Sequence, residues 1–208
     1  MTMHRRGQVY VIACAIIAGL CIMFLSDIEP LYIQVVEKDY IVIAYQLESV
    51  MIEAIAYGSS HMVLENEKFI DAFMEYFNKS LSLIYSLGIV DGNVDRVTVA
   101  VNLTIRQELG LRYLATYEVH YSYDVINHCY IVKLDVLNVK KKGLYPRLRI
   151  RYYHYSTLTP NIKRHRSIKV IGGIVMRVNE TTYDIVMFSK RIIIKDDLGV
   201  FTFISIED

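Results

Sequence analysis

The apolar residues of this chain change their spacing near Val97, from a helical period to the alternating period of a β-strand. Between Arg112 and Val125 apolar and polar residues alternate, as in a strand with one buried face. Similar runs continue toward the C-terminus, and the strands they predict are 97–105, 112–125, 130–136, 147–155, 168–178, 182–188, 190–195 and 200–206. Because no helical pattern intervenes, we expect an antiparallel β-sandwich-like domain or a large curled sheet.

Two amphipathic helices are predicted upstream of these strands. Apolar residues recur every three or four positions over 33–57, and most acidic residues in this stretch, Glu48 among them, are expected off the apolar seam. Gly58 is expected near the end of this helix, and a second apolar stripe covers 66–87. The predicted fold class is therefore α+β, with a helical neck or hairpin before the β domain.

An uncharged apolar run from Val9 to Leu25 lies directly behind Arg5 and Arg6. At about 1.5 Å per residue it reaches roughly 25 Å, close to the ~30 Å hydrocarbon core of a bilayer. The arginines on one side and Asp27 on the other predict a cytoplasmic N-terminus. We expect a single-pass cell-membrane protein, with the lipid bilayer as a partner. Its expected parts are a cytoplasmic leader and transmembrane anchor (1–26), an amphipathic neck or hairpin (27–90) and an extracellular antiparallel β domain (91–208).

Two other fates of this segment are weighed against a permanent anchor. A cleaved signal peptide would close with small residues, but residues 22–27 offer no such pair. The sequence 11–14 resembles a bacterial lipobox ending in Cys14, yet most of the apolar run follows that cysteine. A permanent anchor is the favoured interpretation.

Composition narrows the function classes. The formal net charge is +1, so no global field favours nucleic acid, and none is expected as a partner. Cys14 and Cys21 fall within the predicted span, which leaves Cys129 as the single cysteine of the exported part. The β domain is therefore expected to be held by its core, without a disulfide of its own.

Three Asn-x-Ser/Thr sequons are candidate glycosylation sites: Asn78, Asn102 and Asn179. Asn102 falls inside a predicted strand, and Asn179 is the most turn-like of the three. Their number supports an outward-facing domain.

The predicted strands 112–125 and 130–136 form an antiparallel hairpin, and His120, His128 and Cys129 lie on its two sides, where their nitrogen and sulfur atoms could approach one another. Such groups bind zinc, and Asp124 or Glu118 is the candidate for a fourth ligand. Zinc sites usually show more closely spaced pairs, however, and His120 falls on the polar face of its strand. We therefore expect solvated side chains here, and predict no metal and no cofactor.

No nucleophile elbow, phosphate-binding glycine loop or His-Glu-x-x-His motif is present in the sequence. The acidic segment 91–95 resembles the start of a calcium loop, but Arg96 and Asn102 occupy the positions that need Gly and Glu, so a polar turn is expected. Gly172-Gly173 within an apolar run predicts a strand kink. The chain is not predicted to be an enzyme, and an extracytoplasmic enzyme is the less favoured alternative.

Arg147, Arg149 and Arg151 recur at every second position, so their guanidinium groups are expected on one strand face. Such a row is a candidate basic patch for an acidic polysaccharide, lipid headgroups or nucleic acid. The simpler interpretation is a solvated face whose charges are matched by acidic residues of a neighbouring strand.

The leader sequence Arg5-Arg6-Gly7-Gln8, followed at once by an apolar helix, resembles the class III signal of archaeal type IV pilin-like proteins. The resemblance covers about twenty residues. It implies cleavage between Gly7 and Gln8, packing of the mature apolar helix in a filament core, and display of the β domain outside. The partners that it implies are other pilin-like subunits or further copies of this chain.

These observations predict a membrane-anchored, outward-facing structural or adhesive surface protein, with a pilin-like subunit as one form of it. The alternative is a single-pass anchored module that binds an acidic ligand or a partner protein. In the first case the 33–57 seam packs on the β domain and on neighbouring subunits; in the second it pairs only with 66–87.

Overall fold

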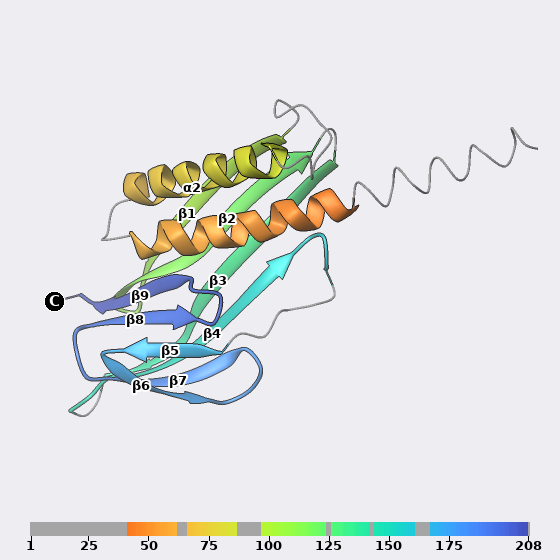
Figure 1. Ribbon diagram of the computed structural model, residues 1–208. Coiled ribbons are helices and arrows are strands. Elements are labelled where there is room, and N and C mark those ends of the chain that lie inside the picture. Colours follow the sequence, from red (N-terminus) through yellow and green to blue (C-terminus); the bar gives the residue numbers. More distant parts are fainter. Residues whose placement is uncertain are drawn as a thin grey trace, which may run out of the picture. The chain divides into compact units, whose positions relative to one another are not determined.

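The computed structural model describes residues 41–61, 66–86, 97–123, 126–141, 144–160 and 167–207 (Figure 1). The first described element is the helix Ile41–Ser60, drawn in orange. The elements after it are α2 (Asn66–Ser86), β1 (Val97–Glu108), β2 (Leu111–Tyr123), β3 (Ile126–Lys140), β4 (Arg147–Ser156), β5 (Ile168–Ile171), β6 (Gly173–Arg177), β7 (Thr182–Met187), β8 (Arg191–Asp196) and β9 (Phe201–Ile206). Each predicted strand is present, and both predicted helices are confirmed over the described residues.

The predicted strand 168–178 is broken at Gly172, as the glycine pair predicted. Gly172 has a φ of +86°, which favours glycine, and it separates β5 from β6. A Cβ on Gly173 would lie 2.6 Å from the carbonyl oxygen of Val186, so glycine is also required by the close approach of β7. The kink lets one continuous segment serve both ends of the sheet.

The strands form one antiparallel sheet in the order β5-β8-β9-β2-β3-β4-β7-β6, and β1 pairs with β2. Its two end strands, β5 and β6, are consecutive in the chain and are joined directly through Gly172. A sheet whose ends meet in this way must curl. The predicted α+β class with an antiparallel sheet is confirmed, and its layers come from the curling of one sheet.

Both helices lie across the same face of β1, β2 and β3, which we call the inner face (Figure 1). Alternate tyrosines of β2 are buried there, and the ring of Phe69 on α2 lies 4.9 Å from that of Tyr117. At the end of the first helix, the hydroxyl of Ser59 accepts a hydrogen bond of 3.0 Å from the amide of Phe201. The segment Ala44–Asp208 is therefore one compact unit, in which the helices belong with the sheet. The expected boundary at residue 26 lies outside the described residues.

The helix Ile41–Ser60 is long and apolar enough to cross a bilayer, by length and composition alone. Half of it is buried within the fold, however, and residues such as Met51 and Ile55 are fully buried. A core helix has the same length and composition as a span, and the packing identifies this one as a core helix. The predicted span, Val9 to Leu25, lies outside the described residues and stays a prediction.

Glu48 corrects one expectation from the helical pattern. It was predicted off the apolar seam, but only 2% of it is exposed. Its carboxylate accepts hydrogen bonds from the hydroxyls of Tyr121, at 3.3 Å, and Ser156. Glu48 lies four residues from buried Ala44 and from buried Ile52, so it shares their stripe. The hydroxyl donors of the sheet offset the cost of burying the carboxylate.

A second buried polar cluster joins β4 to β8 across the interior. His154 Nε2 lies 2.7 Å from Asp196 Oδ2, and the hydroxyl of Tyr152 donates to the same oxygen at 2.8 Å. The other carboxylate oxygen of Asp196 accepts from the amides of Leu198 and Val200, both at 2.9 Å, in the turn before β9. Burial raises the pKa of the Asp196 carboxyl, but the contacts with His154 and Tyr152 outweigh it and hold the pKa below its ordinary value.

We expect Asp196→Asn to lower the free energy of unfolding by about 1–3 kcal/mol, because it removes the charged acceptor of several buried hydrogen bonds. The pKa of Asp196 is lower in the folded than in the unfolded chain. Its contribution is therefore present above about pH 4 and is lost as the pH falls through the folded-state pKa. Urea denaturation at neutral pH and at about pH 3 measures this effect. The difference in free energy of unfolding between wild type and variant should be smaller at the lower pH.

The matched control is Asp197→Asn, which changes the exposed neighbour in the same turn. It should leave the urea midpoint nearly unchanged at both pH values. Equal stabilities of wild type and Asp196→Asn at neutral pH would contradict a structural role for the buried pair.

Candidate functional site

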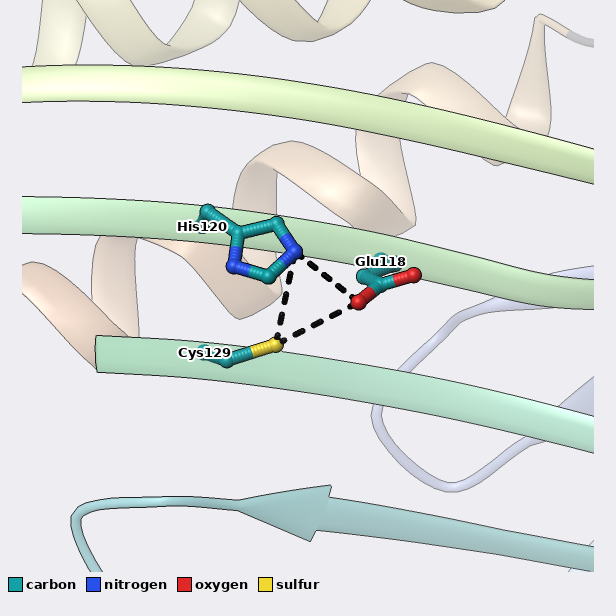
Figure 2. A group of neighbouring side chains, drawn as sticks. All are labelled: Glu118, His120 and Cys129. Carbon is teal, nitrogen blue, oxygen red and sulfur yellow. Dashed lines mark hydrogen bonds and ion pairs between the residues drawn. The ribbon is translucent and has the colours of Figure 1, made fainter. Parts of the chain in front are cut away.

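The outer face of the sheet, opposite the helices, carries a cluster of three potential metal ligands. Glu118 and His120 come from β2 and Cys129 comes from β3 (Figure 2). Glu118 and His120 are two residues apart and so point to the same face. His120 pairs directly with Cys129 in the antiparallel register, which brings the third side chain alongside.

The ligand atoms of this cluster lie close together. His120 Nε2 is 2.8 Å from Glu118 Oε1, and Cys129 Sγ is 3.9 Å from the same oxygen. The sulfur is 4.0 Å from His120 Nε2. Glu118 and Cys129 are half-buried, whereas His120 is exposed. The cluster therefore opens to the outer surface.

Electrostatics keep the thiol protonated in the metal-free cluster. Burial raises the pKa of Cys129 to about 11, and the charge and hydrogen bond of the Glu118 carboxylate add to this effect. Among the described residues, no lysine or arginine lies within ion-pair distance of Glu118, which contacts the imidazole of His120 instead. A thiol in this setting is a weak nucleophile.

The structure separates the residues that the hairpin pattern grouped. His128 lies on the inner face, with its ring 5.4 Å from that of Tyr121, so it does not join His120 and Cys129. Burial lowers the pKa of His128, partly offset by the charge of Glu48. Asp124 and the acidic segment 91–95 lie outside the described residues. Glu118, which the sequence offered only as an alternative fourth ligand, belongs to the cluster.

The basic row predicted on β4 is exposed on the same outer face. Arg147, Arg149 and Arg151 are all exposed, and Arg149 donates two hydrogen bonds of 2.7 and 2.8 Å to the carboxylate of Asp184 on β7. Within the described part of the chain, Arg147 and Arg151 have no ion pair of this kind. The neighbouring strand therefore matches one of the three charges.

A cavity of about 260 Å³ adjoins this row. Its lining residues include Lys140, Arg147, Arg149, Met176 and Asp184. Because the carboxylate of Asp184 is paired with Arg149, Lys140 and Arg147 are two further cations at the cavity. They lie beside apolar lining residues such as Met176. These features suit an anionic ligand with an apolar part.

An apolar edge continues the outer face beyond the basic row. β6 is an end strand of the described sheet, with β7 as its pairing partner. Its residues Ile174 and Met176 are 55% and 58% exposed. Phe188 is 51% exposed and packs against the ring of Tyr145, at 5.3 Å between centroids. Large apolar side chains on an edge strand are typical of a surface that contacts another molecule.

The three sequon asparagines are exposed. Asn78 lies on α2 and Asn102 on β1. Asn179 lies in the turn between β6 and β7, where its side-chain oxygen accepts from the amides of Thr181 and Thr182 at 3.1 and 2.8 Å. Gly7 and Gln8 lie outside the described residues.

The high pKa of Cys129 predicts slow alkylation. With chelator present, iodoacetamide at pH 8 should modify Cys129 roughly tenfold more slowly than an ordinary exposed thiol, because few thiolates form. Glu118→Gln removes the neighbouring negative charge, lowers the thiol pKa and should speed the reaction. Mass spectrometry of the peptide that contains Cys129 measures the rate. Glu180→Gln, a remote exposed change, is the control, and an unchanged rate in Glu118→Gln would contradict the electrostatic coupling.

Comparisons with protein-family models, curated proteins and solved structures found no match for this chain. The resemblance of its first twenty residues to archaeal type IV pilins is therefore neither supported nor contradicted by them, and it stays a prediction.

Proposed function

We propose that this protein is a membrane-anchored, outward-facing surface protein with a structural or adhesive role. The α+β unit Ala44–Asp208 is its exposed head, and the apolar run from Val9 to Leu25 is its anchor. The observation that carries the proposal is the apolar edge at β6, which adjoins the basic row of β4 on the outer face.

The inner face is filled by other parts of the same chain, so a contact with another molecule is expected on the outer face. The two helices and the buried tyrosines fill it. The outer face has exposed arginines next to exposed apolar side chains, a combination suited to contact with another macromolecule. Contact through β6 would cover the free backbone groups of an edge strand, which is how extended partners commonly add to a sheet.

A pilin-like subunit is one form of this function. Its processing would remove residues 1–7 and leave the apolar helix on the mature chain. In that form, β6 and the apolar helix would both contact neighbouring subunits. In an anchored monomer, β6 would instead contact a partner protein.

We expect the native protein to stay in the membrane pellet after alkaline carbonate extraction, because an apolar span resists this treatment. Mass spectrometry of its N-terminus then separates the two forms. A start at Gln8 favours the pilin-like subunit, and a start at Met1 or Thr2 favours a permanent anchor. Release by carbonate, or a start beyond Leu25, would overturn membrane anchoring.

The same membranes test the role of β6. Chemical cross-linking should give adducts that Met176→Glu removes, because a charge on this edge opposes an apolar contact. Leu83→Glu changes a residue that is 60% exposed on α2 and serves as the control. Adducts that persist in Met176→Glu would contradict the proposed contact surface.

The second candidate is a binding module for an acidic ligand, and the cavity beside Arg147 and Lys140 favours it. Arg147→Glu combined with Arg151→Glu should lower the salt concentration at which the protein elutes from immobilised heparin, since it reverses the two charges without a partner among the described residues. Lys169→Glu combined with Lys195→Glu, two exposed changes on β5 and β8 with the same change in net charge, is the matched control. Equal elution of the two variants, at unchanged melting temperature, would argue against this candidate.

A further inference from the structure

The cluster of Glu118, His120 and Cys129 combines a carboxylate, an imidazole and a thiol on one open surface. We propose that these three side chains form a binding site for a zinc-class divalent ion, with the fourth coordination position open to solvent. This site is separate from the surface at β4 and β6, and the proposal does not depend on the anchoring of the chain.

The ligand types select the class of metal. Thiolate sulfur, imidazole nitrogen and carboxylate oxygen are the three groups that proteins use for zinc. Calcium and magnesium prefer oxygen ligands only, and a thiol would exclude them. A site that offers one ligand of each kind therefore favours zinc, with cobalt as a spectroscopic substitute.

The spacing of the ligand atoms fits one ion. Around a tetrahedral zinc ion, atoms bound at about 2.0–2.3 Å lie roughly 3.4–3.6 Å from one another. The separations here are 2.8, 3.9 and 4.0 Å, which bracket these values. Small side-chain rotations suffice to reach them, and the paired strands need not move.

The strands fix the three Cα positions in advance. β2 pairs with β1 on one side and with β3 on the other, and His120 pairs directly with Cys129. On the β1 side, the partner of His120 is Ala100, whose methyl group leaves the outer surface above the imidazole open. A metal on this surface would therefore keep one position for water or for a ligand atom from another molecule.

The local charge also favours a cation. No lysine or arginine of the described residues pairs with Glu118, whose side-chain contacts are with His120 and Cys129. The lysine nearest along this face of β3, Lys133, pairs with Asp135 at 3.6 Å. A divalent ion would supply the positive charge that this half-buried carboxylate lacks.

Metal titration of the full chain in detergent tests the proposal. Under reducing conditions, Zn²⁺ should bind with one ion per chain in competition with a chromogenic chelator. Co²⁺ should give a sulfur-to-cobalt charge-transfer band. Cys129→Ser should remove this band, and His120→Ala should weaken zinc binding by at least about tenfold, the loss that follows even from removal of an outer-shell group.

His61→Ala provides the matched control, because His61 is exposed at the end of the first helix and lies outside the cluster. It should bind zinc like the wild type. X-ray absorption of the wild type, which needs no substitution, should show one sulfur and otherwise nitrogen or oxygen around the ion. Absence of binding, two sulfur ligands, or full binding by both Cys129→Ser and His120→Ala would overturn the proposal. Two sulfur ligands would point to Cys14 and Cys21, and full binding by both variants would place the ion outside the cluster.

Discussion

The register between β2 and β3 is the constraint on which both faces of this sheet depend. It points Tyr117 and Tyr121 to the inner face, under the helices, and places His120 opposite Cys129 on the outer face. Side chains alternate along a strand, so a slip of one residue would expose the tyrosines and bury the imidazole. The buried tyrosines therefore fix the register, and the ligand cluster is a consequence of the same pairing.

Burial of charge accompanies the curling of the sheet. Curling brings the inner face of β4 against the end of β8, where His154 contacts Asp196. On the same face, the first helix places Glu48 in contact with Tyr121. Each carboxylate would be costly to bury alone, but two hydroxyls donate to one oxygen of Glu48, and hydroxyl, amide and imidazole groups contact Asp196. Because these donors come from segments distant in sequence, the polar contacts specify how helix, sheet and turn fit together. They also explain why tyrosines occupy so much of the inner face, since each fills volume and carries a donor.

The elements could be predicted from the sequence, whereas contacts between them could not. Alternation and helical spacing depend on neighbours in the chain, and they located every strand and the kink at Gly172. Glu48 was misplaced because its burial depends on hydroxyls of β2 and β4. The ligand cluster was only half predicted, for a local reason. The predicted strands ended at 125 and resumed at 130, but Tyr123 already pairs with Ile126, and this tighter turn sets Cys129 opposite His120. His128 and Cys129 are adjacent and so point to opposite faces, which the alternation rule alone would have shown.

Two of the edge strands of the sheet, β1 and β6, differ in the side chains that they expose. On β1, the outward residues include Thr98, Ala100 and Asn102, which are small or polar, and a glycan at Asn102 would stand beside its pairing partner Glu118. On β6, Ile174 and Met176 are exposed and no sequon asparagine lies on the strand itself. Polar or glycosylated edges resist pairing with other chains, and apolar edges promote it. Under the proposed function, a partner would therefore be directed to β6, and the ligand cluster on β2 and β3 would stay open to small ligands.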